Sequence, residues 1–179
     1  MDTTVTRFGL ANTVTSIRLL GGLMILALLP AHVLVATALA TLCLILDGID
    51  GRIARARGEA SRFGAWFDNE ADAAVTLVLS ISLIVLHVAG WWVLLIGAMR
   101  YLYLLASLAL PKLRAPLLFS QARRVVGLGQ AILLLAAVLA AGVFPRLAAS
   151  GWLAVLPAIG LIALLWSFGR DAWQQLSAE

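Results

Sequence analysis

Six of the nine acidic residues in this chain lie between positions 47 and 72. Four of them form two pairs, Asp47 with Asp50 and Asp68 with Asp72, spaced three and four residues apart. That spacing places each pair on one face of a helix, within an arc of about 100° or less. Gly58 is a plausible break between the two helices, and a tight antiparallel hairpin would bring the two pairs face to face.

Four carboxylates in a small volume cannot all stay ionised without a partner. Mg²⁺ and Mn²⁺ prefer oxygen ligands, whereas a soft metal would need a Cys/His cluster, and Cys43 is the chain's single cysteine. We therefore expect one or two such ions and a phosphorylated substrate. Arg55 and Ser61 are placed to contact its phosphate or ribose.

Residues without bulk accompany both carboxylate pairs. Gly51 and Ala54 share the stripe of Asp47 and Asp50, and Gly64 shares the stripe of Asp68 and Asp72. Small side chains allow either another helix or a flat ligand to approach the backbone closely.

The composition requires that these residues be positioned in a membrane. The chain has 179 residues, of which 63% are hydrophobic and 12% charged, and its mean hydropathy is +1.02. A soluble domain of this length could not hide so much apolar surface, and a disordered chain would be richer in charge. The net charge of +4 then records orientation in the bilayer and contact with anionic headgroups rather than binding of nucleic acid.

We expect an all-α membrane protein with about six transmembrane helices and a single domain over residues 1–179. Positive residues cluster before the first apolar segment, between the second and third, between the fourth and fifth, and after the sixth, while Arg146 alone lies on the other side. The positive-inside rule places both termini in the cytoplasm. The six segments are about 13–29, 32–46, 73–89, 91–110, 125–143 and 152–168.

The second segment carries the first carboxylate pair into the membrane edge. It has about 15 apolar residues before Asp47, roughly 23 Å of helix, which is shorter than the ~30 Å hydrocarbon core. The helix must therefore continue through Asp47. We expect the active site at the cytoplasmic ends of the second and third helices.

The string from Asp47 to Asp72, D-x2-D-G-x2-A-R-x8-G-x3-D-x3-D, resembles the signature of the CDP-alcohol phosphotransferase (CDP-alcohol phosphatidyltransferase) family at every fixed position. The number of spans, the chain length and the N-terminal element Asn12-x2-Thr15-x2-Arg18 are also similar to those of many members. The resemblance implies an integral membrane enzyme of phospholipid biosynthesis. Such enzymes transfer a phosphatidyl group from CDP-diacylglycerol to an acceptor alcohol and release CMP.

The resemblance also implies residue roles. Asp47, Asp50 and Asp68 would hold the metals, with Asp72 as a further ligand and the general base. The substrate-binding residues for the CDP moiety would be Asn12, Gly51, Ala54, Arg55, Ser61 and Gly64. We also expect a homodimer in the cytoplasmic (inner) membrane of a bacterium.

The acceptor is less constrained by the sequence. Arg100, Arg123 and Arg124 are candidates for an acceptor pocket, because a phosphate near the metal site needs cations. This favours glycerol 3-phosphate, giving phosphatidylglycerol phosphate, while an inositol phosphate or an uncharged or zwitterionic alcohol stays open. We interpret Gln130 and Ser107 as interhelical hydrogen bonders.

Two other classes of protein use carboxylates in a membrane. Prenyltransferases bind a lipid diphosphate through aspartates and Mg²⁺, but their clusters lie on two well-separated helix pairs of longer chains without the Gly-x2-Ala-Arg element. A small carrier coupled to ions through carboxylates would predict inverted repeats and broken helices, which the sequence does not indicate.

Overall fold

The computed structural model describes residues 10–57, 62–110, 112 and 121–177, which form helices and turns without a strand. Side chains are described there except at 10–12, 14, 47–57, 62–63, 65 and 124. The helices are α1 (Leu10–Leu28), α2 (Val33–Arg57), α3 (Arg62–Val85), η1 (Trp91–Val93), α4 (Leu94–Ala109), α5 (Gln121–Val143), α6 (Pro145–Ala149), η3 (Trp152–Ala154) and α7 (Val155–Ser177).

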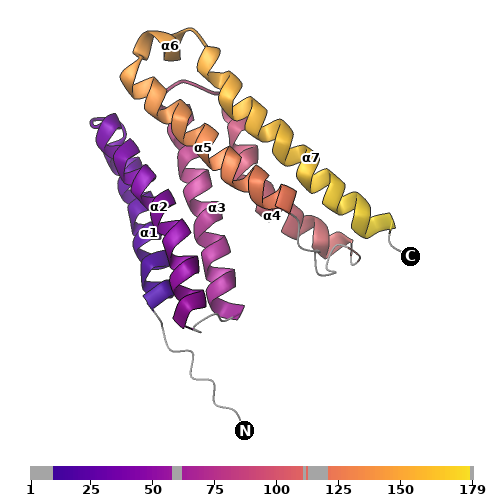
Figure 1. The fold of residues 1–179 in the computed structure, drawn as a ribbon. Helices are drawn as coiled ribbons and strands as arrows, with labels where there is room; N and C mark the ends of the chain where they lie inside the picture. Colours follow the sequence, from indigo (N-terminus) through magenta and orange to yellow (C-terminus); the bar gives the residue numbers. More distant parts are fainter. Residues whose placement is uncertain (1–9, 58–61, 111, 113–120, 178–179) are drawn as a thin grey trace.

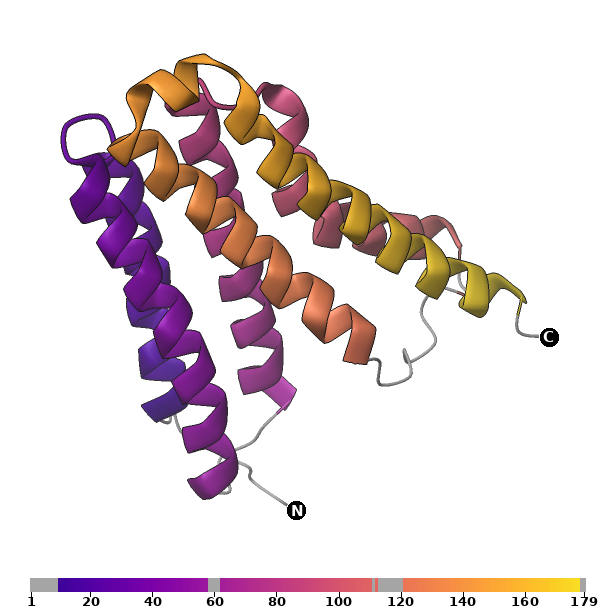
Figure 2. The same cartoon turned by 45° about the horizontal axis from the view of Figure 1, so that its top comes forward.

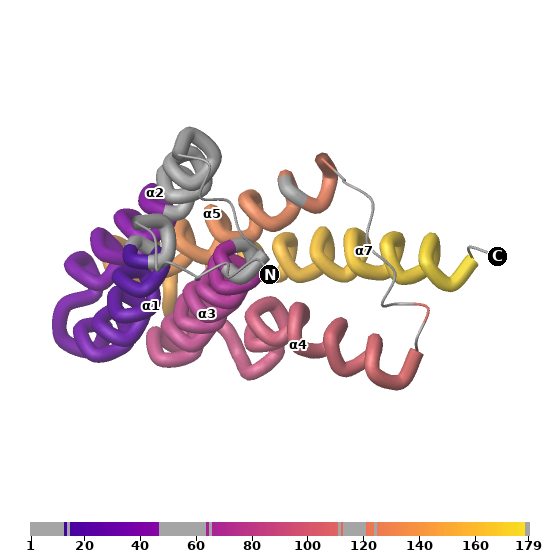
Figure 3. Tube along the Cα trace, turned by 90° about the horizontal axis from the view of Figure 1, so that it is seen from below, coloured from indigo at the N-terminus to yellow at the C-terminus, as the bar shows by residue number. Residues whose placement is uncertain are grey.

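The long helices run alternately up and down, so that the beginning of α1 and the end of α7 lie on the same side of the molecule (Figure 1). Helix α1 packs against α2 and α3, and α5 contacts α2, α3 and α7. Figure 2 shows α5 between the α1–α2 pair and α7. From below, α1, α2 and α3 cluster while α4, α5 and α7 extend away from them (Figure 3). The structure therefore has a three-helix half and a more open half.

The interior and the exterior are both apolar. Ile25, Leu79 and Leu134 are completely buried and join α1, α3 and α5 in one hydrophobic core. Large apolar side chains such as Leu23 and Ile162 are about two-thirds exposed on the outer helix faces. Hydrocarbon is the environment in which such faces are stable, so the exterior fits a lipid-embedded protein.

Three helices are long and apolar enough to cross a membrane, namely Trp91–Ala109, Gln121–Val143 and Trp152–Ser177. The apolar stretches Thr15–Leu28 and Val33–Leu46 are shorter. The expected membrane protein built from helices is thus confirmed in outline over the described residues. Six spans and cytoplasmic termini stay predictions.

Several boundaries differ from those expected. Helix α2 does continue through Asp47, to Arg57, as the length argument required. Helix α3 ends at Val85 rather than near residue 89, because His87 adopts a left-handed φ of 55°. The amide of Val88 then donates to the Leu83 carbonyl and that of His87 to the Ile84 carbonyl, which is a Schellman cap.

The last two apolar segments are joined by a helix that we did not expect. The fifth expected segment ends at about residue 143 and the sixth begins at about 152, but α6 occupies Pro145–Ala149 between them. Proline suits the first position of a helix because its ring fixes φ and its missing N–H would have no partner there. Helix α7 then runs to Ser177, beyond the expected end at 168.

Glycines set the distance between helices at two contacts. A Cβ on Gly97 would lie 2.7 Å from the Leu77 Cα, and one on Gly142 would lie 2.0 Å from a Val33 methyl group. Both distances are below any real Cβ contact. Glycine therefore allows α4 to approach α3, and α5 to approach α2.

Candidate active site

Two carboxylates of the aspartate motif lie one turn apart on α3 and meet a buried arginine of α1. The Arg18 Nη1 atom donates to Asp68 Oδ1 over 3.0 Å, and Nη2 donates to Asp72 Oδ1 over 2.5 Å. The Arg18 side chain is 1% exposed, whereas those of Asp68 and Asp72 are 38% and 47% exposed. One guanidinium thus holds both carboxylates from behind and leaves them accessible on the other side.

Sequence reasoning assigned Arg18 only to topology and to the N-terminal element, so it missed this contact. A signal was present, because an arginine followed by an apolar span usually faces a partner or a wet cavity. What the sequence lacks is the partner's identity, since Arg18 and Asp72 are 54 residues apart. The charge-assisted bonds orient the carboxylates that the motif singles out.

The remaining motif residues are placed by backbone alone. Asp47, Asp50, Gly51, Ala54 and Arg55 lie in the C-terminal part of α2, which contacts α3. Their side chains lie outside the described residues, as does that of Asn12 in α1, and Ser61 lies outside them entirely. Gly64 lies on α3 one turn before Asp68. The predicted meeting of the two carboxylate pairs is therefore untested.

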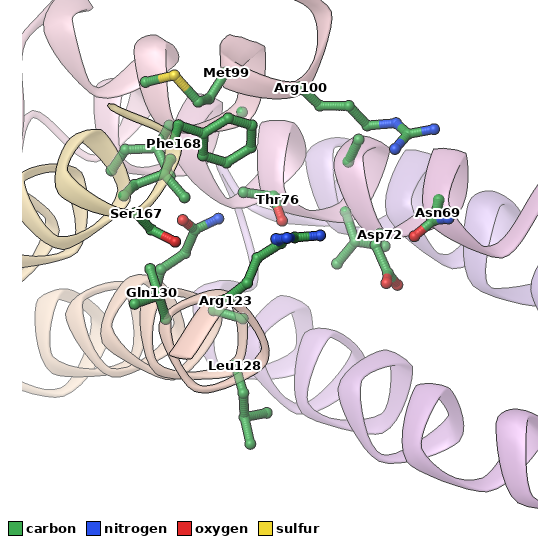
Figure 4. A pocket seen from close by; sticks show the side chains of 18 of the residues that line it. Asn69, Asp72, Thr76, Met99, Arg100, Arg123, Leu128, Gln130, Ser167 and Phe168 are labelled. Carbon is green, nitrogen blue, oxygen red and sulfur yellow. The ribbon is translucent and has the colours of Figure 1, made fainter. Parts of the chain in front are cut away.

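A cavity of about 840 Å³ opens beside Asp72. Helices α1, α3, α4, α5 and α7 supply most of its wall. Arg18, Arg100 and Arg123 line it together with Asp72, and Figure 4 shows Arg123 extending into it from α5 toward Asp72. Apolar side chains such as Phe168 form much of the rest. A cavity of this size accommodates a small polar molecule beside the carboxylate.

Each of the two described acceptor candidates is already bound to a carboxylate. Arg100 donates through Nε and Nη2 to Glu70 Oε1, over 3.2 and 2.7 Å. Arg123 Nε donates to Asp171 Oδ2 over 2.8 Å, and Arg170 Nη2 donates to the other oxygen of Asp171 over 3.0 Å. Both arginines line the same cavity, and each is held there by its carboxylate partner.

Glu70 and Asp171 fix these arginines in place, and the sequence reading gave neither acid a role. Asp171 is 5% exposed although it follows an apolar segment. A charge buried in that way requires a partner, which was the available signal. The side chain of Arg124, the third acceptor candidate, lies outside the described residues.

The comparison with family models supports the motif. The model of the CDP-alcohol phosphatidyltransferase family matches residues 8–168, which include the aspartate motif and all lining residues of the cavity. The chain belongs to the CDP-alcohol phosphatidyltransferase family. A search of curated proteins found no match to the chain.

Family membership establishes the general reaction. The chain is a CDP-alcohol phosphotransferase, a membrane enzyme of phospholipid synthesis that transfers a phosphatidyl group from a CDP-alcohol to an acceptor alcohol. Members generally depend on a divalent metal. Asp68 and Asp72 suit this requirement, because both carboxylates are more than one-third exposed beside the Arg18 contact and carboxylate oxygens are the ligands that Mg²⁺ prefers. Among the described side chains, no group of three could hold a metal, but the side chains of Asp47 and Asp50 are not among them.

Proposed function

We propose that this enzyme transfers the phosphatidyl group of CDP-diacylglycerol to glycerol 3-phosphate and releases CMP. The observation that carries the proposal is the cavity in which Asp72, Arg100 and Arg123 meet. Asp72 belongs to the motif shared with the family, and the arginines offer charge-assisted hydrogen bonds to an acceptor phosphate.

In this mechanism, Asp47, Asp50, Asp68 and Asp72 would hold two Mg²⁺ or Mn²⁺ ions. Such ions would neutralise the charge of the pyrophosphate and of the departing CMP. Arg18 holds Asp68 and Asp72 in place from α1. The CDP moiety is bound by Asn12, Gly51, Ala54, Arg55, Ser61 and Gly64.

Asp72 removes the proton of the acceptor hydroxyl as its oxygen attacks the lipid-side phosphorus. One oxygen–phosphorus bond forms there, and the bond from that phosphorus to the oxygen bridging to CMP breaks. The carboxylate of Asp72 is about half exposed and lines the cavity, so an acceptor hydroxyl can reach it. General base catalysis requires this hydrogen-bonding reach.

The proposed setting is a bacterial cytoplasmic membrane, in which a homodimer of six-span, single-domain chains keeps both termini and the active site on the cytoplasmic side. The up-and-down course of the long helices supports placing both termini and the motif on one side (Figure 1). The distribution of positive residues supports the cytoplasmic assignment of that side.

The test is an acceptor assay with purified enzyme, CDP-diacylglycerol and Mg²⁺, followed by analysis of the lipid product. We expect phosphatidylglycerol phosphate and an equal amount of CMP. Arg100→Ala and Arg123→Ala should raise the KM for glycerol 3-phosphate by roughly 10- to 150-fold, the range for a lost charge-assisted hydrogen bond, and the KM for CDP-diacylglycerol much less. If the variants raise the KM of both substrates equally, the two arginines have a structural role. The proposed acceptor would then be a neutral alcohol instead of glycerol 3-phosphate.

A further inference from the structure

Two buried polar side chains in the cavity have no hydrogen-bond partner for their oxygen atoms among the described residues. They are Gln130 on α5, which is 9% exposed, and Ser167 on α7, which is 1% exposed. Both line the cavity together with Asp72. Figure 4 shows both at the same end of the cavity, with the Arg123 guanidinium drawn between them and Asp72.

The other buried serines behave differently. Ser80, Ser82 and Ser107 each donate to a carbonyl of their own helix, at Thr76, Val78 and Leu104. A serine inside a helix commonly satisfies its hydroxyl in this way. The Ser167 hydroxyl does not make such a bond, so this position is not explained by helix packing.

Gln130 was expected to bond between helices, but its Oε1 atom makes no such bond within the described structure. Across the α5–α7 contact, Gln130 packs against Gly160, where a Cβ would lie 3.6 Å from the Gln130 Cβ. A buried polar atom without a partner is unfavourable compared with an apolar side chain of similar shape. Glutamine and serine at these positions therefore indicate a ligand that supplies the missing bonds.

The chemistry of the two groups defines that ligand. The Gln130 Oε1 atom accepts a hydrogen bond, and the Ser167 hydroxyl both donates and accepts. A hydroxyl group complements both atoms, whereas a quaternary ammonium or a second carboxylate does not. We propose that Gln130 and Ser167 bind a second hydroxyl of the acceptor while its first hydroxyl meets Asp72, so that this enzyme selects polyhydroxy acceptors.

This inference rests on the proposed acceptor cavity. Four acceptors distinguish a requirement for a second hydroxyl from a requirement for a phosphate. Glycerol 3-phosphate has both a phosphate and a second hydroxyl, while 3-hydroxypropyl phosphate lacks the second hydroxyl. Glycerol lacks the phosphate, and propan-1-ol lacks both. Each is assayed with full-length enzyme, CDP-diacylglycerol and Mg²⁺ through CMP release and the lipid product, alongside myo-inositol 1-phosphate and the single-hydroxyl acceptor serine.

We expect removal of the second hydroxyl to raise the acceptor KM about tenfold in the unaltered enzyme, since one or two neutral hydrogen bonds are lost. In Gln130→Leu and in Ser167→Ala, this difference should fall to about threefold or less. The matched control is Ser82→Ala, which removes a buried hydroxyl that bonds within its helix and does not line the cavity. It should leave the tenfold difference unchanged.

Thermal unfolding provides a readout that a structural role would change. Because the Gln130 oxygen has no partner within the described structure, Gln130→Leu should leave Tm unchanged or raise it. A clear fall in Tm, an unchanged hydroxyl preference in both variants, or preferred use of serine would overturn the proposal. Use of glycerol or myo-inositol 1-phosphate in place of glycerol 3-phosphate would overturn the proposed acceptor and leave the hydroxyl subsite standing.

Discussion

At the scale of single residues, Arg18 connects the N-terminal helix to the chemistry. It is almost fully buried, yet it reaches two carboxylates that are more than one-third exposed. A divalent ion bound to Asp68 and Asp72 would share these carboxylates with the guanidinium. Arg18 therefore both orients the carboxylates and supplies positive charge when no metal is bound.

Replacing Arg18 should expose that second role. In the presence of a chelator, Arg18→Gln should destabilise the fold by about 1.5–3 kcal/mol, because hydrogen bonds to charged groups are lost. Saturating Mg²⁺ should then raise the Tm of the variant more than that of the unaltered enzyme, because the metal takes over the neutralisation of Asp68 and Asp72. Thermal unfolding in detergent with and without Mg²⁺ measures both effects.

The control for this experiment is Arg146→Gln. Arg146 is exposed and lies in α6, on the opposite side of the molecule from the motif. The Arg146→Gln substitution removes the same charge without touching the carboxylates, so Mg²⁺ should raise its Tm by as much as it raises that of the unaltered enzyme. An equal response in Arg18→Gln as well would show that Arg18 does not compete with the metal.

Asp68 and Asp72 should respond differently to the same substitution. Asp72→Asn removes the proposed base, so kcat should fall by about 10²–10⁴-fold, the usual contribution of a positioned base. Asp68→Asn should instead raise the Mg²⁺ concentration needed for half-maximal activity, since it removes a charged metal ligand. Steady-state kinetics over a Mg²⁺ titration separate the two, and near-normal turnover in Asp72→Asn would refute its role as the base.

Much of the site was predictable because its signal is local. The spacing of Asp68 and Asp72 places them on one face of α3 whatever surrounds that helix. The pairing of Arg123 with Asp171 was not predictable in this way, because the two residues are 48 positions apart and meet only when α5 and α7 pack. Gln130 and Ser167 are ordinary residues in sequence, and only their lack of partners in the described structure distinguishes them.

At the scale of helices, length and hydropathy predicted the elements better than their ends. The continuation of α2 through Asp47 followed from the thickness of a bilayer. The early end of α3 depends on a left-handed His87, a conformation for which glycine is the usual signal. Helix α7 extends past its apolar part to Ser177, and Asp171 in this extension is bound by Arg123 and Arg170, a pairing that the hydropathy pattern does not register.

The α3–α4 contact offers a test of how helices position the site. Gly97 lies on α4 one turn before Arg100, and a Cβ there would meet the α3 backbone. Gly97→Ala should therefore cost about 1–3 kcal/mol of stability through overpacking. It should also displace Arg100 from Glu70 and raise the acceptor KM. Thermal unfolding and acceptor kinetics measure the two effects.

Gly129 on α5 is the matched control. A Cβ at this position would meet nothing within 4 Å in the described structure. Gly129→Ala should leave both Tm and acceptor KM close to those of the unaltered enzyme, or raise Tm slightly through helix propensity. Equal behaviour of the two variants would mean that the α3–α4 distance is not set by Gly97.

At the scale of the whole molecule, orientation decides which compartment supplies the acceptor. The long helices alternate in direction, and the ends of α2, α4 and α7 lie on the side where α1 begins (Figure 1). Positive residues flank these ends, whereas Arg146 is the basic residue of the opposite turns. The positive-inside rule then predicts that the aspartate motif lies on the cytoplasmic side.

Cysteine labelling tests this orientation directly. In a Cys43→Ala background, which has no cysteine, Ser150→Cys and Ser177→Cys introduce one thiol each at exposed serines on opposite sides. A membrane-impermeant maleimide should label Ser150→Cys in right-side-out vesicles and Ser177→Cys only in inverted vesicles. Labelling of both variants from the same side would show that α7 does not cross the membrane between these two positions. The reversed pattern would place the carboxylates, and the acceptor pool they use, outside the cytoplasm.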